Sequence, residues 1–177
     1  AEKNIGNESE QQKHLTRCET EVDRLDEMIA DVLTLSRLEH SNNAFTADEI
    51  ELSSFVKQVV NDCQYYANSK NVTITFAGEA SYSLLADVKL LASDISNVIN
   101  NAVKYSPNDN KVIVELSQQN KKILLSISDE GPGVPNDMIT ELFNPFFRVA
   151  DGRERSSGGT GLGLTISQYL ASAMHGK

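Results

Sequence analysis

Apolar residues in the first forty positions recur at alternating steps of three and four. This spacing is typical of one stripe on a long helix of the bundle or coiled-coil type. The stripe consists of Cys18, Val22, Leu25, Ile29 and Val32, widened by Met28, Leu33, Leu35 and Leu38. Such a helix alone would leave apolar surface in water, so we expect a partner helix that is missing here or supplied by another chain. Packing only against the rest of its own domain is the alternative.

Residues 45–177 alternate between strand-like and helix-like patterns. Strands are expected at 50–52, 72–76, 82–85, 112–116 and 123–127, the last two as an antiparallel hairpin. Ser53 and Asp87 are suitable N-caps for two helices, the second of which ends near Tyr105. A further helix follows Gly163, with Tyr169 on its apolar face. This order predicts an α/β sandwich with helices on one face of a mixed sheet.

Charge divides the chain of 177 residues into two units. Residues 1–51 hold 13 acidic and 5 basic residues, whereas residues 52–177 hold 12 acidic and 11 basic residues. All four prolines and seven of the ten glycines lie between Pro107 and Gly163, so irregular backbone is concentrated late in the chain. We therefore predict a helical segment over residues 1–44 and an α/β domain over residues 45–177.

Composition also argues against several classes of function. The net charge of −9, with no basic stripe, disfavours nucleic acid as a partner. No apolar run approaches the roughly 20 residues that a membrane-spanning helix needs. Cys18 and Cys63 are isolated and lack metal-ligand spacing, so we expect neither a zinc site nor a disulfide.

A first chemical motif lies at the end of the second predicted helix of the α/β unit. Asn97 and Asn101 are four residues apart, so their amides share one helical face. Amide oxygens are neutral, hard ligands that can complete the coordination of a Mg²⁺ bound to phosphates. Lys104 adds positive charge and Tyr105 an aromatic face. The alternative is a plain solvated helix face.

A second motif, Asp129-Glu-Gly131-Pro-Gly133, follows the last predicted strand. A carboxylate there can accept a hydrogen bond from the exocyclic amine of adenine, whereas guanine would present a carbonyl oxygen. Gly131 and Gly133 allow the backbone to approach a flat ring closely. A simple turn is the alternative, because such residues are common in loops for conformational reasons.

A third motif is glycine-rich and opens the last predicted helix. It runs through Gly158, Gly159, Thr160, Gly161, Leu162 and Gly163. Free N–H groups at a helix N-terminus suit a polyphosphate. The lysine of a P-loop is absent, and no βαβ unit precedes the motif. The glycines are also compatible with the hinge of a mobile loop.

Between the last two motifs lies Phe143-Asn-Pro-Phe146-Phe147-Arg148, followed by the polar segment 151–157. Aromatic residues and an arginine beside a charged, glycine-flanked segment suggest a lid anchored at one end. Packing of Phe143 and Phe146 in the core is the alternative.

In order and spacing, the four motifs resemble the N, G1, F and G2 boxes of sensor histidine kinases. This family shares the GHKL or Bergerat ATP-binding fold with gyrase, Hsp90 and MutL. The segment Arg24–Arg37 resembles the second helix of the family's dimerisation and phosphoacceptor hairpin. The resemblance implies a catalytic domain that binds ATP and Mg²⁺ and transfers the γ-phosphoryl group to a histidine, for relay to a response regulator.

By the same resemblance, each motif acquires a role. Asn101 would ligate Mg²⁺ with support from Asn97, and Lys104 and Arg148 would contact phosphates. Tyr105 would stack near adenine and Asp129 would bind its amino group. The remaining nucleotide contacts would come from Gly131, Gly133, Gly159, Thr160, Gly161, Leu162 and Gly163. Of these residues, Asn97, Lys104 and Arg148 would act in the transfer step.

The sequence also departs from the family pattern. The acceptor motif of the first hairpin helix is absent, and His14, His40 and His175 are expected to be surface residues. The acceptor histidine must then come from a helix outside this chain, and the complete protein is expected to be a homodimer. The family's last pair of strands is also expected to be missing. Full-length relatives would place this chain on the cytoplasmic side of an inner-membrane sensor protein.

Two other functions remain open from the sequence. Relatives that hydrolyse ATP carry a glutamate where Asn97 stands, because a carboxylate must activate the attacking water. A gyrase-type ATP hydrolase is therefore disfavoured. A dimeric scaffold whose nucleotide only orders the lid is the other alternative.

Overall fold

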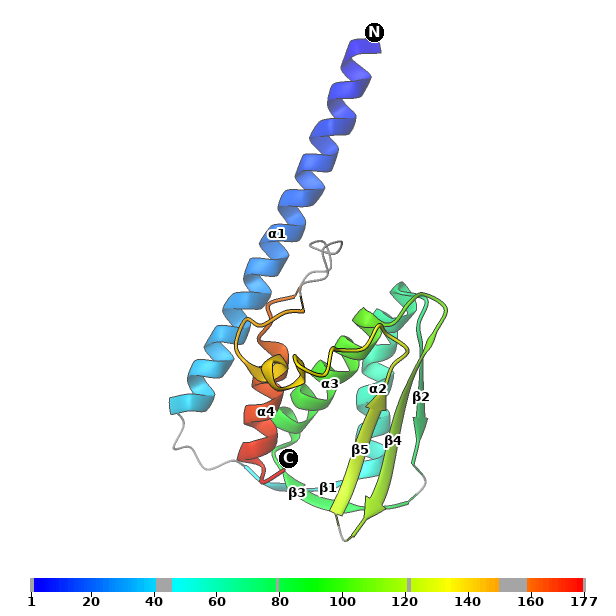
Figure 1. The fold of residues 1–177 in the computed structure, drawn as a ribbon, viewed down its shortest axis with the longest axis vertical. Helices are drawn as coiled ribbons and strands as arrows, with labels where there is room; N and C mark the ends of the chain where they lie inside the picture. The colour runs from blue at the N-terminus through cyan, green and yellow to red at the C-terminus, as the bar shows by residue number, and fades with distance from the viewer. Residues whose placement is uncertain (1, 41–45, 79, 121, 150–158, 177) are drawn as a thin grey trace.

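The structure is a computed structural model that describes residues 2–40, 46–78, 80–120, 122–149 and 159–176, with the side chains of the first helix described from Glu10 to Ser36. Helix α1 (Glu2–His40) projects from an α/β domain (Figure 1). The predicted boundary near residue 44 falls among the undescribed residues, as does the polar segment 151–157. Among the described residues, no helix is long and apolar enough to cross a membrane.

The α/β domain contains two small sheets. Strands β1 (Asp48–Glu51) and β3 (Ser83–Ala86) form an antiparallel pair. In the other sheet, β4 (Lys111–Gln119) lies between β2 (Thr73–Ala77) and β5 (Lys122–Ser128). The β2–β4 pair is parallel and the β4–β5 pair is antiparallel, so the predicted mixed sheet and hairpin are confirmed.

Helices α2 (Leu52–Ser69) and α3 (Val88–Tyr105) cover one face of the larger sheet (Figure 1). The core between these layers is built from aliphatic side chains that alternate along β4 and recur along the helices, of which Val56, Ile99, Val103, Val112 and Val114 are fully inaccessible to solvent. Burying one such side chain contributes about 1.5–3 kcal/mol. The core therefore holds α3, which carries the first chemical motif, rigidly against the sheet.

The last helix, α4 (Gly163–Ala173), contacts both α3 and α1. Ile166 and Leu170 on its buried face form a cluster with Leu162 at its N-cap, and Leu35 of α1 packs against this cluster. Tyr169 is 43% exposed, so its predicted place on the apolar face is wrong. A short 3₁₀ helix, η1 (Ile139–Phe143), lies in the connection between β5 and α4.

The two predicted N-caps have different outcomes. Asp87 caps α3 as predicted, because its side chain accepts hydrogen bonds from the backbone N–H groups of Lys89 and Leu90. The prediction for Ser53 is wrong, since Glu51 caps α2 by accepting from the N–H groups of Ser53 and Ser54. Helix α2 accordingly begins at Leu52, which the pattern had placed in a strand.

Candidate functional site

Helix α3 brings the two asparagine amides to the side of the domain where α4 begins. The Nδ2 atom of Asn97 donates to the carbonyl oxygen of Gly163 at 2.5 Å and to the Oγ of Ser167 at 2.9 Å. A Cβ atom on Gly163 would lie 2.6 Å from Oδ1 of Asn97, so only glycine fits at this contact. Asn101, half-buried, follows one turn later on α3. The first and third motifs are therefore in direct contact.

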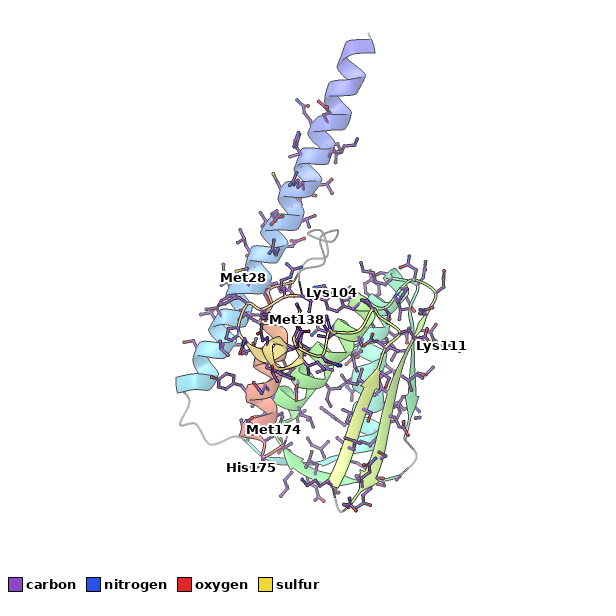
Figure 2. All side chains as sticks on the ribbon, viewed as in Figure 1. Met28, Lys104, Lys111, Met138, Met174 and His175 are labelled. Carbon is purple, nitrogen blue, oxygen red and sulfur yellow. The ribbon has the colours of Figure 1, made fainter. Side chains whose placement is uncertain are left out.

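Lys104 lies near the end of α3, where Figure 2 labels it, and its charge interacts with that of Arg148. The Lys104 ammonium is half-buried and occupies the space that a side chain on Gly159 would need. Burial, followed by the positive charge of Arg148, lowers the pKa of Lys104, and Glu27 of α1 partly opposes this shift. Like charges that repel one another beside a glycine-rich segment would be stabilised by an anion between them.

The second motif lies against the same helix end. The Asp129 carboxylate is exposed and accepts a hydrogen bond from the Gly131 N–H at 2.7 Å. A Cβ atom on Gly131 would lie 2.9 Å from the Tyr105 carbonyl oxygen. The Tyr105 ring is 46% exposed, with the Lys104 Nζ 5.4 Å from its centroid. Gly133 is also exposed. Both Asp129 and the Tyr105 ring are thus accessible to a flat ligand.

The connection that carries Arg148 holds the glycine-rich segment by its backbone. The Phe146 N–H donates to the Gly161 carbonyl oxygen at 2.9 Å, and the Thr165 hydroxyl donates to the Phe143 carbonyl oxygen at 2.9 Å. Gly161 has a φ of +74°, and a Cβ there would lie 2.9–3.1 Å from the Phe146 backbone. Phe143 and Phe146 are 39% and 59% exposed, so the alternative that they pack in the core is wrong.

Helix α1 also reaches the glycine-rich segment. The buried Thr160 hydroxyl donates to an Asp31 carboxylate oxygen at 2.6 Å and accepts from the Leu162 N–H at 3.1 Å. Leu162 is fully buried beneath this contact. The segment predicted to bind phosphates is therefore fastened on one side to α1 and on the other to the connection around Phe146.

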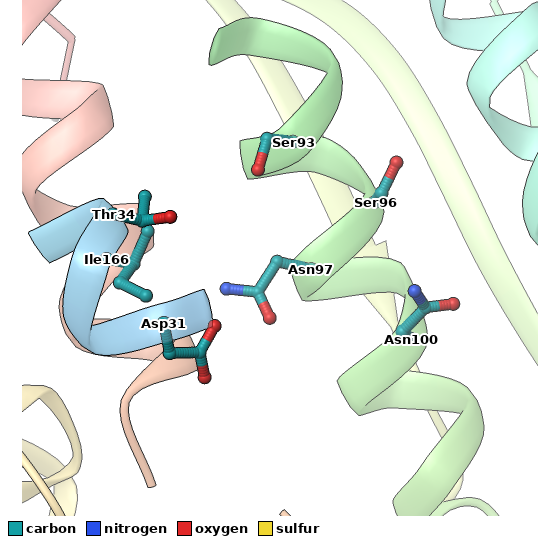
Figure 3. A pocket seen from close by; sticks show the side chains of 7 residues that line it. All are labelled: Asp31, Thr34, Ser93, Ser96, Asn97, Asn100 and Ile166. Atoms are coloured by element: carbon teal, nitrogen blue, oxygen red, sulfur yellow. The ribbon is translucent and has the colours of Figure 1, made fainter. Parts of the chain in front are cut away.

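A polar cavity of about 260 Å³ opens between α1 and α3 (Figure 3). Its lining is mostly polar and consists of Asp31, Thr34, Ser93, Ser96, Asn97, Asn100 and Ile166. Asn97 points from α3 toward Asp31 in this view. Asp129 is not among the lining residues, so the cavity adjoins the amide end of the predicted site and not its adenine end.

The fold thus joins the predicted motifs in a chain of contacts. Asn97 contacts Gly163, Lys104 contacts Gly159, and the Tyr105 backbone adjoins Gly131. The pattern of the sequence did not identify Asp31, Asp94 or Ser167, which also lie at this site. Their partners are distant in sequence, Ser167 being 70 residues from Asn97, so no local spacing signals them.

Comparison with known proteins assigns the chain to a family of ATPases. Residues 86–177 match the family of histidine kinase-, DNA gyrase B-, and HSP90-like ATPases. This match covers more than half of the chain, and the chain belongs to that family. The predicted GHKL α/β fold is thereby confirmed.

Particular relatives are sensor kinases. The chain is 34% identical over 160 residues to the sensor histidine kinase CpxA of Escherichia coli K12, a match covering 89% of this chain and 34% of CpxA. It is 33% identical over 153 residues to the sensor-like histidine kinase SenX3 of Mycolicibacterium smegmatis, covering 86% of this chain and 40% of SenX3. The chain therefore spans only about a third to two fifths of these relatives.

A solved structure resembles the chain over nearly its whole length. Full-length ShkA, crystallised in complex with AMPPNP, superposes with a TM-score of 0.74 at 26% identity and covers 94% of this chain and 34% of ShkA. The Acinetobacter baumannii histidine kinase AdeS has a TM-score of 0.68 at 22% identity, covers 87% of this chain and 70% of its own, and so supports the fold alone.

Proposed function

We propose that this chain is the nucleotide-binding catalytic part of a sensor histidine kinase, which binds ATP with Mg²⁺ and transfers the γ-phosphoryl group to a histidine. The observation that carries the proposal is the position of Lys104 and Arg148. Their charges interact beside Gly159, at the segment that leads into the N-terminus of α4. Two cations beside the N-terminus of a helix suit a polyphosphate.

The residues at the site also fit a magnesium ion. Both Nδ2 hydrogens of Asn97 are used by Gly163 and Ser167, which leaves Oδ1 as the atom available to a ligand. Asn101 supplies a second amide on the same helical face, and hard oxygen donors of this kind suit Mg²⁺. Bound there with the nucleotide, Mg²⁺ would supply neutralisation of phosphate charge.

The side chains favour transfer over hydrolysis. An asparagine at position 97 cannot take a proton from water, and its amide is held by α4. An imidazole is itself a nucleophile, so the site need only orient the phosphates and stabilise their charge. We assign the orientation of the phosphates to Lys104, Arg148 and the 159–163 segment, and recognition of the adenine amine to Asp129, with Gly131, Gly133 and Tyr105 beside the base.

The wider setting follows from the resemblance to sensor kinases. We propose that the acceptor histidine lies on a hairpin helix that pairs with α1 in a homodimer of the complete protein. A response regulator would then receive the phosphoryl group. The names of the relatives support this setting. We also propose that this chain lies on the cytoplasmic side of a membrane-bound sensor.

The binding site is tested with a fluorescent ATP analogue. Asn101→Ala and Asp129→Ala should each weaken binding by about tenfold or more, the size expected for losing a bond to a charged or metal-bound group. Asn61→Ala and Asp62→Ala, on the exposed side of α2, serve as matched controls and should bind like the wild type. Wild-type affinity in both site variants would refute the assignment.

The reaction is tested by adding a histidine-bearing hairpin helix and labelled ATP. We expect label on the added helix that is stable to base and lost in acid, as a phosphohistidine is. Steady release of phosphate without any added helix would instead indicate a hydrolase. Normal ATP binding with neither product would favour the scaffold.

A further inference from the structure

The carboxylate of Asp31 connects helix α1 to the 159–163 segment, to which we assign the binding of phosphates. One of its oxygens accepts a hydrogen bond from the Thr160 hydroxyl at 2.6 Å, and the two residues are 129 positions apart in the sequence. Asp31 is half-buried and Thr160 is only 8% exposed, so water has little access to this bond. Leu35, one turn later on α1, packs against the apolar cluster of α4. One face of α1 therefore holds the start of α4 by a polar and an apolar contact.

Thr160 lies between two glycines with left-handed backbone conformations. The φ angle is +132° at Gly159 and +74° at Gly161. Glycine keeps more conformational freedom than any other residue unless neighbouring groups restrain it. Within residues 159–161 only Thr160 has a side chain, so its hydroxyl is the side-chain group through which another element can restrain this turn. The bond to Asp31 therefore acts where the backbone of the segment has the greatest intrinsic freedom.

The carboxylate also determines how the Thr160 hydroxyl is used. A hydroxyl has one hydrogen, and an ionised carboxylate can only accept, so this hydrogen is directed to Asp31. The lone pairs of the hydroxyl oxygen then accept from the Leu162 N–H at 3.1 Å. This side-chain turn leads directly into α4, whose N-cap position is the apolar Leu162. Since the first N–H groups of a helix have no intrahelical partner, the orientation of residues 160–162 sets the direction in which α4 presents them.

We propose that Asp31 is a positioning residue which, through the Thr160 hydroxyl, holds the 159–163 segment in the conformation that binds the phosphates of the nucleotide. Without this carboxylate the segment must be ordered when the nucleotide binds, and the loss of conformational entropy lowers the affinity. The inference rests on the proposed function, because the segment binds phosphates only if the chain binds ATP. It adds a residue of helix α1 to a site whose motifs all lie between residues 97 and 163.

The charge of Asp31 acts in the opposite direction to its hydrogen bond. A negative charge near a triphosphate repels it, whereas the charges of Lys104 and Arg148 attract it. The two effects of Asp31 can be separated, because Asp31→Asn removes the charge and keeps an oxygen that accepts from Thr160. We expect Asp31→Ala to bind phosphates more weakly than the wild type, and Asp31→Asn to bind them at least as tightly as the wild type.

The test compares the phosphate end of the ligand with its adenine end. The dissociation constants of tripolyphosphate and of adenosine are measured by displacement of the fluorescent ATP analogue. Asp31→Ala should weaken the binding of tripolyphosphate by about tenfold, the size expected for loss of a hydrogen bond to a charged group, and leave that of adenosine unchanged. Asp26→Ala, which removes an exposed carboxylate of the same helix, should match the wild type. Unchanged or tighter binding of tripolyphosphate by Asp31→Ala, or equal weakening of both ligands, would overturn the inference.

Amide hydrogen exchange tests the contact without any ligand. In the free protein, exchange at Leu162 should be faster in Asp31→Ala and in Thr160→Val, and remain as in the wild type in Asp31→Asn. The double variant should exchange no faster than Thr160→Val alone, because both changes remove the same bond. Wild-type exchange in Asp31→Ala would show that the carboxylate does not hold the segment and would overturn the inference. If the wild type bound neither ATP nor tripolyphosphate, the proposed function would fail together with the role in phosphate binding, while the exchange measurement would still decide whether Asp31 holds the segment.

Discussion

The ionisation of Lys104 connects the charge of a single residue to ligand binding. Burial and the neighbouring Arg148 depress the pKa of this ammonium in the free protein. A triphosphate beside Nζ would favour the charged form and raise the pKa again. At a pH between the pKa of Lys104 in the free protein and its pKa in the complex, binding of the triphosphate is accompanied by uptake of a proton. The affinity for the triphosphate therefore falls as the pH rises through this range.

This coupling predicts a proton uptake that can be measured. Titration calorimetry of ATP binding in two buffers of different ionisation enthalpy measures the protons taken up per bound ATP. This proton uptake should be larger at alkaline pH than near neutrality. Lys104→Gln should abolish it and weaken binding by about tenfold, as expected for loss of a charge-assisted contact. Lys57→Gln, an exposed lysine of α2, is the control. Equal uptake in Lys104→Gln and the wild type would assign the proton to another group.

Residue types with a direct chemical meaning could be identified from the sequence, whereas their supporting contacts could not. The amides of Asn97 and Asn101 share a face because helical periodicity requires it. Ser167 has no such signal, since its contact with Asn97 depends on how α4 packs on α3. The backbone bond from Phe146 to Gly161 depends likewise on the path of the connection, which side-chain patterns do not specify.

At the level of elements, the start of α2 shows how a long side chain can replace the expected cap. Glu51 accepts from the N–H groups of Ser53 and Ser54, and also from the hydroxyls of Ser54 and Ser81. These bonds, chiefly those from Ser54, lower the pKa of Glu51 to about 2. A carboxylate with a depressed pKa stabilises the fold above its ordinary pKa, and this contribution is lost as the pH falls toward about 2.

The cap therefore predicts a pH-dependent difference in stability. In urea unfolding at pH 7, Glu51→Ala should have a lower free energy of unfolding than the wild type. This difference in free energy should become smaller as the pH approaches about 2. Asp62→Ala, in the exposed middle of the same helix, should show no such convergence. If the difference in the free energy of unfolding were the same at all pH values, the charge of Glu51 would not contribute to stability.

Strong periodicity accounts for the elements that were predicted well. The hairpin β4–β5 and the helix from Asp87 to Tyr105 follow alternating and helical patterns that also agree with their turn and cap residues. At Leu52 the local pattern predicts a strand, whereas capping by Glu51 starts helix α2 at that residue. The parallel pairing of β2 with β4 is a property of the tertiary arrangement, which periodicity alone does not specify.

At the scale of the whole molecule, helix α1 has two faces with different roles. One face is tied to the α/β domain through Asp31, which accepts from Thr160, and through Leu35, which packs on α4. The other carries most of the apolar stripe that the sequence predicted, with Val22, Leu25, Ile29 and Val32 between 43% and 58% exposed. A stripe of this length in water favours helix association.

The two faces should therefore be separable by mutation. We expect the chain to self-associate through the exposed stripe, and Ile29→Glu should weaken this in sedimentation equilibrium because it places a charge in a packed helix seam. Binding of the ATP analogue should be unaffected, since Ile29 faces away from the domain contact. Asp31→Ala should have the opposite effect, and self-association should persist in this variant. The Thr160 hydroxyl would lose its bond to Asp31, so amide hydrogen exchange should become faster at Leu162, whose N–H donates to that hydroxyl. Wild type and Ile29→Glu both sedimenting as monomers would exclude a second copy as the partner of this stripe.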